Sequence, residues 1–202
     1  MITNDQINNI LGTNDSYKQP AKLLELMLDD EQRIQAFYDF LELETNMSYE
    51  WFQEAYELEH ADRKGNKQDF TPHSVANLIT RLTLDDSPTH YFESACGNGG
   101  IMIQHWNEQR LRVGIGNYNP KAFWYQVEEL SDRSLPFLIF NMAIRGMNGA
   151  ILHGDSIERI FKDVYFIRNM REDYGGFSEV IKMPKTEVLQ RELKIEKWSG
   201  SL

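Results

Sequence analysis

The sequence predicts an α/β fold in which helices flank a parallel sheet. Two observations lead to this prediction. From Asp69 onward, short apolar runs that favour strands alternate with stretches of helical spacing, which is the pattern of βαβ units. Before Asp69, apolar residues recur at helical spacing. We therefore divide the chain into an acidic helical segment, residues 1–64, and a sheet-containing core, residues 65–202.

The helical segment is expected to hold three main helices. Apolar residues keep helical spacing across residues 21–44, and Asp29 in the middle of this stretch predicts the N-cap of a second helix. Ser48 predicts the cap of a third helix. The charged residues 61–68 contain a glycine and predict a linker or an exposed loop.

The core is expected to begin with a helix and then to alternate strands and helices. Thr71-Pro72 favours a helix start, with Val75, Leu78, Ile79 and Leu82 following at core spacing. Strands are expected at 90–92, 112–116 and 149–155, and helices at 99–110, 120–131 and 134–147. Beyond the third strand, two strand-like runs at 164–168 and 177–183 flank a polar, glycine-rich stretch. They predict a hairpin, followed by a short helix at 185–194.

Charge and composition exclude several classes of protein. Residues 1–62 hold 14 acidic and 3 basic residues, so the front of the chain would repel phosphate and offers no basic face for nucleic acid. Instead it is a solvated surface, a docking surface for a basic partner, or a mimic of the charge of DNA. The single cysteine excludes an internal disulfide, and no apolar run or leader pattern predicts a membrane span or secretion. We expect a cytoplasmic protein that binds no metal.

The run Glu93-Ser94-Ala95-Cys96-Gly97-Asn98-Gly99-Gly100 is the strongest functional signal. It stands between a predicted strand and a predicted helix. Glycines allow a ligand to approach the backbone closely, and a helix N-terminus offers unpaired N–H groups. The run therefore predicts a loop that holds a small ligand.

Several motifs in order give the chain a family resemblance. They are Asp69-Phe70-Thr71-Pro72, the glycine run, Asn119-Pro120, Asn141-Met142, Gly146 and His153-Gly154-Asp155-Ser156. Over roughly residues 50–169 the chain resembles the adenine-N6 DNA methyltransferases, especially the modification subunit of type I restriction systems. The resemblance implies a Rossmann-like sheet that holds S-adenosylmethionine, shortened here and extended by the helical segment and the hairpin.

The resemblance also implies a set of cofactor-binding residues. Phe70, Thr71 and Pro72 would lie near the methionine end. Glu93 replaces the usual Asp and would bind the amino group, while Ala95, Gly97 and Gly99 would let the backbone approach the cofactor. Asn117 stands where an acidic residue normally grips the ribose, and Asp155 would contact the adenine ring.

Simpler roles remain open for some of these residues. Thr71-Pro72 is in any case a good helix start, and Asp155 can simply cap a helix that begins at Ser156. Cys96 is expected to be a small buried residue rather than a nucleophile. His105 and His153 have no further ligands at metal-binding spacing and are expected to be structural.

The catalytic motif of the family is missing. These enzymes carry N/D-P-P followed by an aromatic residue, which accepts hydrogen bonds from the adenine amino group and stacks on the flipped base. No two of the six prolines are adjacent, so this motif does not occur in the sequence. Asn169 is the nearest match by position, with Tyr174 or Phe177 as a possible ring. After the fourth strand we expect only a hairpin and a tail, where a full methyltransferase sheet has further strands.

Three functions follow from these observations. The favoured one is a methyltransferase-like protein that binds S-adenosylmethionine without transferring methyl groups by itself, and that docks a protein partner through the acidic segment 20–62. The second is an active adenine-N6 DNA methyltransferase that contacts DNA only weakly or through a partner. The third is a methyltransferase of a small molecule or a protein.

Overall fold

The computed structural model describes residues 2–59, 71–83, 89–171 and 175–200. Phe70 and Tyr174 lie outside these ranges. The helices are α1 (Asn4–Leu11), α2 (Gln19–Met27), α3 (Asp30–Leu43), α4 (Gln53–Glu59), α5 (His73–Thr83), α6 (Gly100–Val113), α7 (Leu135–Ile144) and α8 (Glu187–Glu192). Three 3-10 turns are η1 (Ser16–Lys18), η2 (Ile115–Asn117) and η3 (Pro120–Ala122). The strands are β1 (His90–Ser94), β2 (Trp124–Glu129), β3 (Gly149–Asp155), β4 (Ile160–Arg168), β5 (Glu179–Lys182) and β6 (Lys197–Trp198).

Of the strand pairings in the described residues, β1 with β2, β2 with β3 and β4 with β6 are parallel, and the other two are antiparallel. The order of the sheet is β1-β2-β3-β4-β5, with β6 paired to β4. Strands β1, β2 and β3 run parallel, whereas β4 is antiparallel to β3 and β5 is antiparallel to β4. Among the residues that the structure describes, β1 pairs only with β2 and so forms one edge. This arrangement confirms the α/β class, with a mostly parallel sheet, and the C-terminal hairpin.

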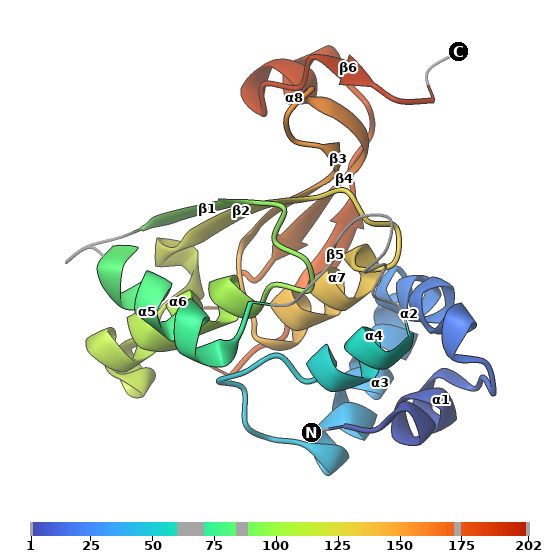
Figure 1. Cartoon of the computed structure of the whole chain (residues 1–202). Helices are drawn as coiled ribbons and strands as arrows, with labels where there is room; N and C mark the ends of the chain where they lie inside the picture. The colour runs from blue at the N-terminus through green and yellow to red at the C-terminus, as the bar shows by residue number, and fades with distance from the viewer. Residues whose placement is uncertain (1, 60–70, 84–88, 172–174, 201–202) are drawn as a thin grey trace.

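Each face of the sheet has its own apolar core. Helices α1 to α7 lie on one face, and α8 with β6 lies on the other (Figure 1). On the helical face, Tyr125, Val127 and Ile151 are fully buried. On the opposite face, Leu152 and Phe161 pack against Leu189 and Trp198. Alternate residues of a strand point to opposite faces, so β2 and β3 supply both cores.

The N-terminal helices share the larger core with the sheet. Phe140 in the middle of α7 is fully buried and makes edge-to-face contacts with Phe37 and Phe40 of α3. Its ring also lies 5.1 Å from that of Phe52, measured between centroids. Aromatic pairs of this geometry add about 0.5–1.5 kcal/mol each beyond the area they bury. The helical segment is therefore held to the core by an aromatic cluster.

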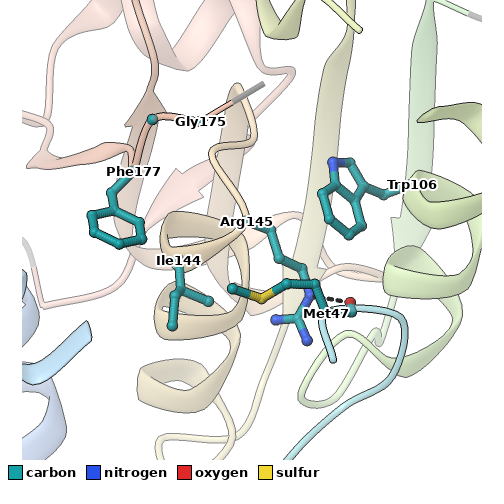
Figure 2. Close-up of a pocket in the computed structure, with 7 residues that line it drawn as sticks. Met47, Trp106, Ile144, Arg145, Gly175 and Phe177 are labelled. Carbon is teal, nitrogen blue, oxygen red and sulfur yellow. Dashed lines mark hydrogen bonds between the residues drawn. The ribbon is translucent and has the colours of Figure 1, made fainter. Parts of the chain in front are cut away.

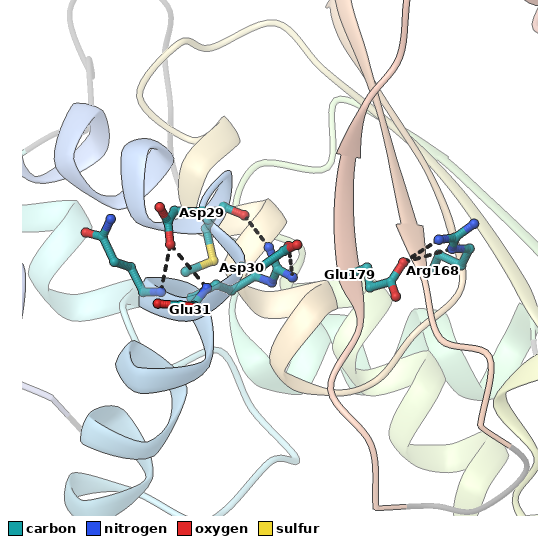
Figure 3. Close-up of polar contacts among 8 residues, drawn as sticks. Asp29, Asp30, Glu31, Arg168 and Glu179 are labelled. Carbon is teal, nitrogen blue, oxygen red and sulfur yellow. Dashed lines mark hydrogen bonds and ion pairs between the residues drawn. The ribbon is translucent and has the colours of Figure 1, made fainter.

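Several acidic residues of this segment stabilise it locally. Asp29 caps α3 by accepting hydrogen bonds from the N–H groups of Glu31 and Gln32, as its position in the sequence predicts (Figure 3). Asp30 pairs with the buried Arg33 at 2.7 Å.

Figure 3 also shows Arg168 of β4 paired with Glu179 of β5, an ion pair that joins the two strands of the hairpin.

The second strand and the helix after it were predicted in the wrong place. Residues 112–116 are not a strand: α6 continues to Val113, and the 3-10 turn η2 follows. Residues 120–131 are not a helix, since they form η3 and β2. Aromatic and β-branched residues are concentrated in 123–127, and this composition favours a strand over a helix.

Two details of the predicted helices also differ. Ser48 does not cap the third helix, because α4 begins at Gln53. Helix α5 begins directly after Thr71-Pro72, as predicted, and the carbonyl of Pro72 accepts a hydrogen bond from Ala76. However, its buried residues are Ala76 and Thr80, whereas Val75, Leu78 and Leu82 are exposed.

The remaining elements agree with the sequence prediction. The helix expected at 134–147, the strand at 149–155 and the short helix at 185–194 correspond to α7, β3 and α8. None of the helices in the described ranges is long and apolar enough to cross a membrane.

Candidate functional site at the carboxyl edge of the parallel strands

The parallel strands bring three chain segments to one edge of the sheet. Ser94 at the end of β1 is in register with Glu128 of β2, which is in register with Leu152 of β3. In parallel sheets, ligands bind outside the carboxyl ends of the strands. The loop Ala95–Gly99 leaves this edge and leads directly into α6.

The loop turns sharply because three of its residues have left-handed backbone angles. The φ angles of Ala95, Gly97 and Gly99 are 57°, 58° and 90°. The two glycines differ in what surrounds them. A Cβ on Gly97 would meet nothing within 4 Å, whereas a Cβ on Gly99 would approach the Cε of Met102 to 2.7 Å and the Cδ1 of Leu138 to 3.0 Å. Gly97 therefore borders open space, whereas a Cβ on Gly99 would displace the ends of the Met102 and Leu138 side chains.

Glu129, the last residue of β2, fixes this loop from the neighbouring strand. Its Oε2 accepts a hydrogen bond from the N–H of Gly97 at 2.7 Å, and its Oε1 accepts one from Ser131 at 2.8 Å. Burial raises the pKa of Glu129, while these backbone N–H groups lower it. Sequence reasoning missed this residue, although the strand-like run 123–127, followed directly by two acidic residues, was a usable signal.

Glu93 contributes a second carboxyl group on the same side of the sheet. Its Oε2 accepts a hydrogen bond from the hydroxyl of Tyr91 at 2.7 Å. Burial raises the pKa of Glu93 to about 7; the Tyr91 bond lowers it, and the charge of Glu129 raises it again. Two carboxyl groups thus lie beside the glycine loop, where they can accept hydrogen bonds from amino and hydroxyl groups.

Asp155 lies at the same edge, at the end of β3, but it does not cap a helix. Its Oδ1 accepts hydrogen bonds from the N–H groups of Ile157 and Glu158 at 2.8 and 2.9 Å. Residues 156–159 form a turn into β4, so the helix expected from Ser156 is absent. Asp155 is therefore a turn-stabilising residue that stands next to the candidate site.

The expectation that Asn117 ends the second strand is wrong. Asn117 belongs to the 3-10 turn η2, its side chain is exposed, and its Nδ2 donates to the carbonyl of Val113. The acidic position that Asn117 was thought to replace is occupied by Glu129 at the true end of β2.

Asn169 lies at the other end of the strands, beside the start of β3 and away from the glycine loop. Because β4 is antiparallel to β3, the residues that precede Asn169 pair with Gly149 at the start of β3. At about 3.3 Å per residue, the length of β3 separates the two edges by roughly 20 Å. The side chain of Asn169 is buried and donates to the carbonyls of Gly146 and Gly176. Asn169, the residue nearest by position to the missing catalytic motif, therefore lies far from the glycine loop.

The other residues considered from the sequence have structural surroundings. Cys96 is buried, and burial raises the pKa of its thiol, which keeps it protonated. Phe177 packs on Phe37, with 4.9 Å between ring centroids. His105 is buried against Tyr91, and His153 lies beside Asp132. Within the described ranges, no group of three or more His, Cys, Asp or Glu residues is arranged to hold a metal ion.

A small pocket lies away from the glycine loop (Figure 2). It is lined by Met47, Trp106, Ile144, Arg145, Gly175, Gly176 and Phe177. Its volume of about 160 Å³ is below the roughly 300–1,000 Å³ of typical ligand pockets. None of its lining residues was assigned to cofactor binding from the sequence, and Phe177 had been considered only as a stacking ring.

The glycine loop lies in a part of the chain that matches a known protein family. The family model described as N-6 DNA methylase matches residues 45–172, more than half of the chain. No curated protein matches the chain. The matched range includes β1, the glycine loop, β2 with Glu129, and β3 with Asp155.

Proposed function

Because the chain belongs to the N-6 DNA methylase family, we propose that it binds S-adenosylmethionine at the carboxyl edge of β1 and β2. In this proposal it is an adenine-N6 methyltransferase-like protein that does not transfer methyl groups by itself. It acts as a non-catalytic subunit or regulator of DNA modification and restriction.

One contact carries the cofactor proposal: the hydrogen bond between Glu129 and the N–H of Gly97. S-adenosylmethionine has an amino group, a ribose diol and a carboxylate. Glu93 and Glu129 supply acceptors for the first two, and the N-terminus of α6 favours the third. The open space beside Gly97 leaves room for the ligand to approach the backbone.

The proposal that transfer is not autonomous rests on two observations. The sequence contains no adjacent prolines and hence no N/D-P-P-aromatic motif. In addition, the strand that follows β3 runs antiparallel, so its end carries Asn169 away from the glycine loop. A base placed next to the methyl donor would meet no motif residue from this strand.

The alternative is an active adenine-N6 DNA methyltransferase that needs a partner for DNA recognition. Family membership favours it. In this case the chain itself would carry a degenerate form of the catalytic motif, and a partner would supply only DNA recognition. Transfer of labelled methyl groups to unmethylated DNA by the purified chain alone would establish activity and contradict the non-catalytic proposal.

Calorimetric titration of the purified chain with S-adenosylmethionine tests cofactor binding directly. We expect saturable binding with a dissociation constant in the micromolar range, a typical value for a small cofactor (about −8 kcal/mol). The Gly97→Ala variant should not bind, whereas Gly12→Ala should bind normally. Gly12 is a matched control because it also has a left-handed φ, 62°, and a Cβ added there would meet no atoms within 4 Å, but it ends α1 far from the loop. Wild-type protein that does not bind the cofactor contradicts the proposal.

The acidic helical segment is proposed as the surface that docks a basic protein partner. A test of this surface needs acidic side chains that do not stabilise the helices themselves. Asp29, Asp30 and Glu44 hold local structure and are unsuitable, since Glu44 accepts hydrogen bonds from Tyr49 and Asn46. We propose the triple variant Glu31→Lys, Glu42→Lys and Glu54→Lys. Loss of a partner that binds wild-type protein at low salt supports the surface, and an unchanged set of partners contradicts it.

A further inference from the structure

A buried hydrogen-bond network joins the N-terminal segment to the glycine loop. Its centre is Asn141 on α7, whose side chain is fully buried. The Nδ2 of Asn141 donates to the backbone carbonyl of Asn98 in the loop at 2.9 Å, and to the Oε1 of Glu50 at 2.9 Å. Glu50 lies in the segment before α4, distant in the sequence from both. A single amide group therefore contacts the loop and the N-terminal segment.

Two charged residues fix the direction of this amide. Arg145, one helical turn further along α7, donates from Nη1 to the Oδ1 of Asn141 at 2.8 Å. Glu50 accepts from the other end of the same amide. If the amide of Asn141 were reversed, its oxygen would face the carboxylate of Glu50 and its NH₂ group would face the guanidinium of Arg145. Both hydrogen bonds would then be lost, because two acceptors or two donors would face each other. The pair therefore keeps the N–H groups of Asn141 directed at Asn98.

The segment that carries Glu50 is itself clamped onto the core. Arg145 donates to the carbonyls of Met47 and Tyr49 at 3.0 and 2.6 Å. Gln104 of α6 donates to the carbonyl of Ser48 at 2.8 Å. Residues 47–50 thus form a strap across α6, which follows the glycine loop in the sequence, and the end of α7, which carries Asn141.

Asn98 depends on this contact because its side chain offers no other anchor. Both polar atoms of the side chain are buried without a hydrogen-bond partner among the residues that the structure describes. Its carbonyl is held by Asn141. The flanking residues Gly97 and Gly99 both have left-handed φ angles. Glycine adopts this conformation easily, but it also adopts many others, so the two glycines do not by themselves hold the loop in one conformation. Asn141 is therefore the anchor of the loop at Asn98, in addition to the contact of Glu129 with Gly97.

We propose that Asn141 is a positioning residue for the glycine loop, and that Glu50 in the strap orients it. The strap 47–50 then shapes the glycine loop through Asn141. This inference rests on the proposed function, since it assigns the residues that shape the loop for S-adenosylmethionine.

The structure offers a matched control at the other edge of the sheet. Asn169 is equally buried, and its Nδ2 also donates to two acceptors, the carbonyls of Gly146 and Gly176, at 3.0 and 3.1 Å. Asn141→Ser and Asn169→Ser should lose similar thermal stability. Only Asn141→Ser should disturb the glycine loop.

The decisive measurement is hydrogen–deuterium exchange of the backbone amides of 96–100, combined with titration of S-adenosylmethionine. We expect exchange at these amides to rise, and affinity to fall, by about tenfold in Asn141→Ser, the loss expected for one buried hydrogen bond. Both should stay within about twofold of wild type in Asn169→Ser. Equal effects of the two variants on the loop, or unchanged exchange in Asn141→Ser, would overturn the proposal.

The Glu50 variants decide the matter if Asn141→Ser does not fold. Glu50→Gln keeps an acceptor for Asn141 and should preserve loop exchange and affinity, whereas Glu50→Ala should reproduce the defect. Equal behaviour of these two variants contradicts the orienting role. If wild-type protein does not bind S-adenosylmethionine, the proposed function fails, and the exchange data alone still judge whether Asn141 positions the loop.

Discussion

The carboxylate of Glu129 at the end of β2 accepts a hydrogen bond from the N–H of Gly97, in the loop after β1, at 2.7 Å. This contact joins the ends of two neighbouring parallel strands. It also places an acidic side chain at the position where nucleotide-binding sheets grip a ribose. The first predictions concern this contact.

Replacement of Glu129 by Ala should weaken binding of S-adenosylmethionine. The variant removes an acceptor for the cofactor and releases the N–H of Gly97 from its present partner. Hydrogen bonds to charged groups contribute about 1.5–3 kcal/mol, so we expect a loss of affinity of roughly 10- to 150-fold. Asn117→Ala is the matched control, because its exposed side chain lies in η2. Titration calorimetry of both variants checks the prediction, and equal losses would contradict it.

Gly99→Ala should damage folding rather than binding alone. A Cβ at this position would lie 2.7 Å from the Cε of Met102 and 3.0 Å from the Cδ1 of Leu138, on a backbone with a φ of 90°. Overpacking of this kind costs about 1–3 kcal/mol, and the left-handed φ adds to this cost. Chemical denaturation should show a clear loss of stability relative to Gly97→Ala, which meets no atoms. Equal stability of the two variants would show that the loop yields easily.

Stability should depend on pH through Glu50. Burial raises the pKa of this carboxyl to about 7, from 4.5 for an ordinary glutamate. Between these values the folded state binds more protons than the unfolded state, so the contribution of Glu50 to stability falls as pH rises from about 4.5 to 7. Glu50→Gln removes this dependence.

The variant should therefore become more stable relative to wild type as pH rises, by at most about 3 kcal/mol for a shift of this size. Denaturation curves of both proteins between pH 5 and pH 8 measure the difference. The comparison is needed because buried His105, whose pKa is lowered to about 4, opposes the trend in both proteins. A difference that is constant across this range contradicts the assignment.

Phe140→Ala should unfold the helical segment and the sheet together. The ring of Phe140 contacts those of Phe37, Phe40 and Phe52. Its removal should cost about 3–5 kcal/mol, the usual range for a buried Phe. Circular dichroism and tryptophan fluorescence should report one coincident transition in wild type and variant. Two separate transitions would show that the helices and the sheet are independent units.

The sequence predicted the local elements well where a single signal dominated. The apolar run 149–155 became β3, and Asp29 capped α3 through its side chain. The glycine run was also identified correctly as a loop between strand and helix. In each case the signal lies within a few residues of the element that it specifies.

The errors arose where the local sequence was compatible with two secondary structures and long-range packing decided between them. Gly114 and Gly116 made 112–116 resemble a strand between turns, while the chain continued α6 to Val113 instead. Because of this error, the second strand was predicted too early in the chain. Asn117, and not Glu129, was then taken as the residue at its end. The direction of β4 could not be read from the sequence, because strand patterns carry no sign of parallel or antiparallel pairing. The distance of Asn169 from the glycine loop could therefore not be predicted.

The hairpin strands also determine where the sheet can begin to assemble. Strands β3, β4 and β5 are neighbours both in the chain and in the sheet, whereas β1 and β2 join only after the long connections 95–123 and 130–148 close. Closing longer loops costs more entropy before their contacts form. We therefore expect β1 to dock last and to leave first. A ligand held by the loop after β1 would then act chiefly by slowing unfolding.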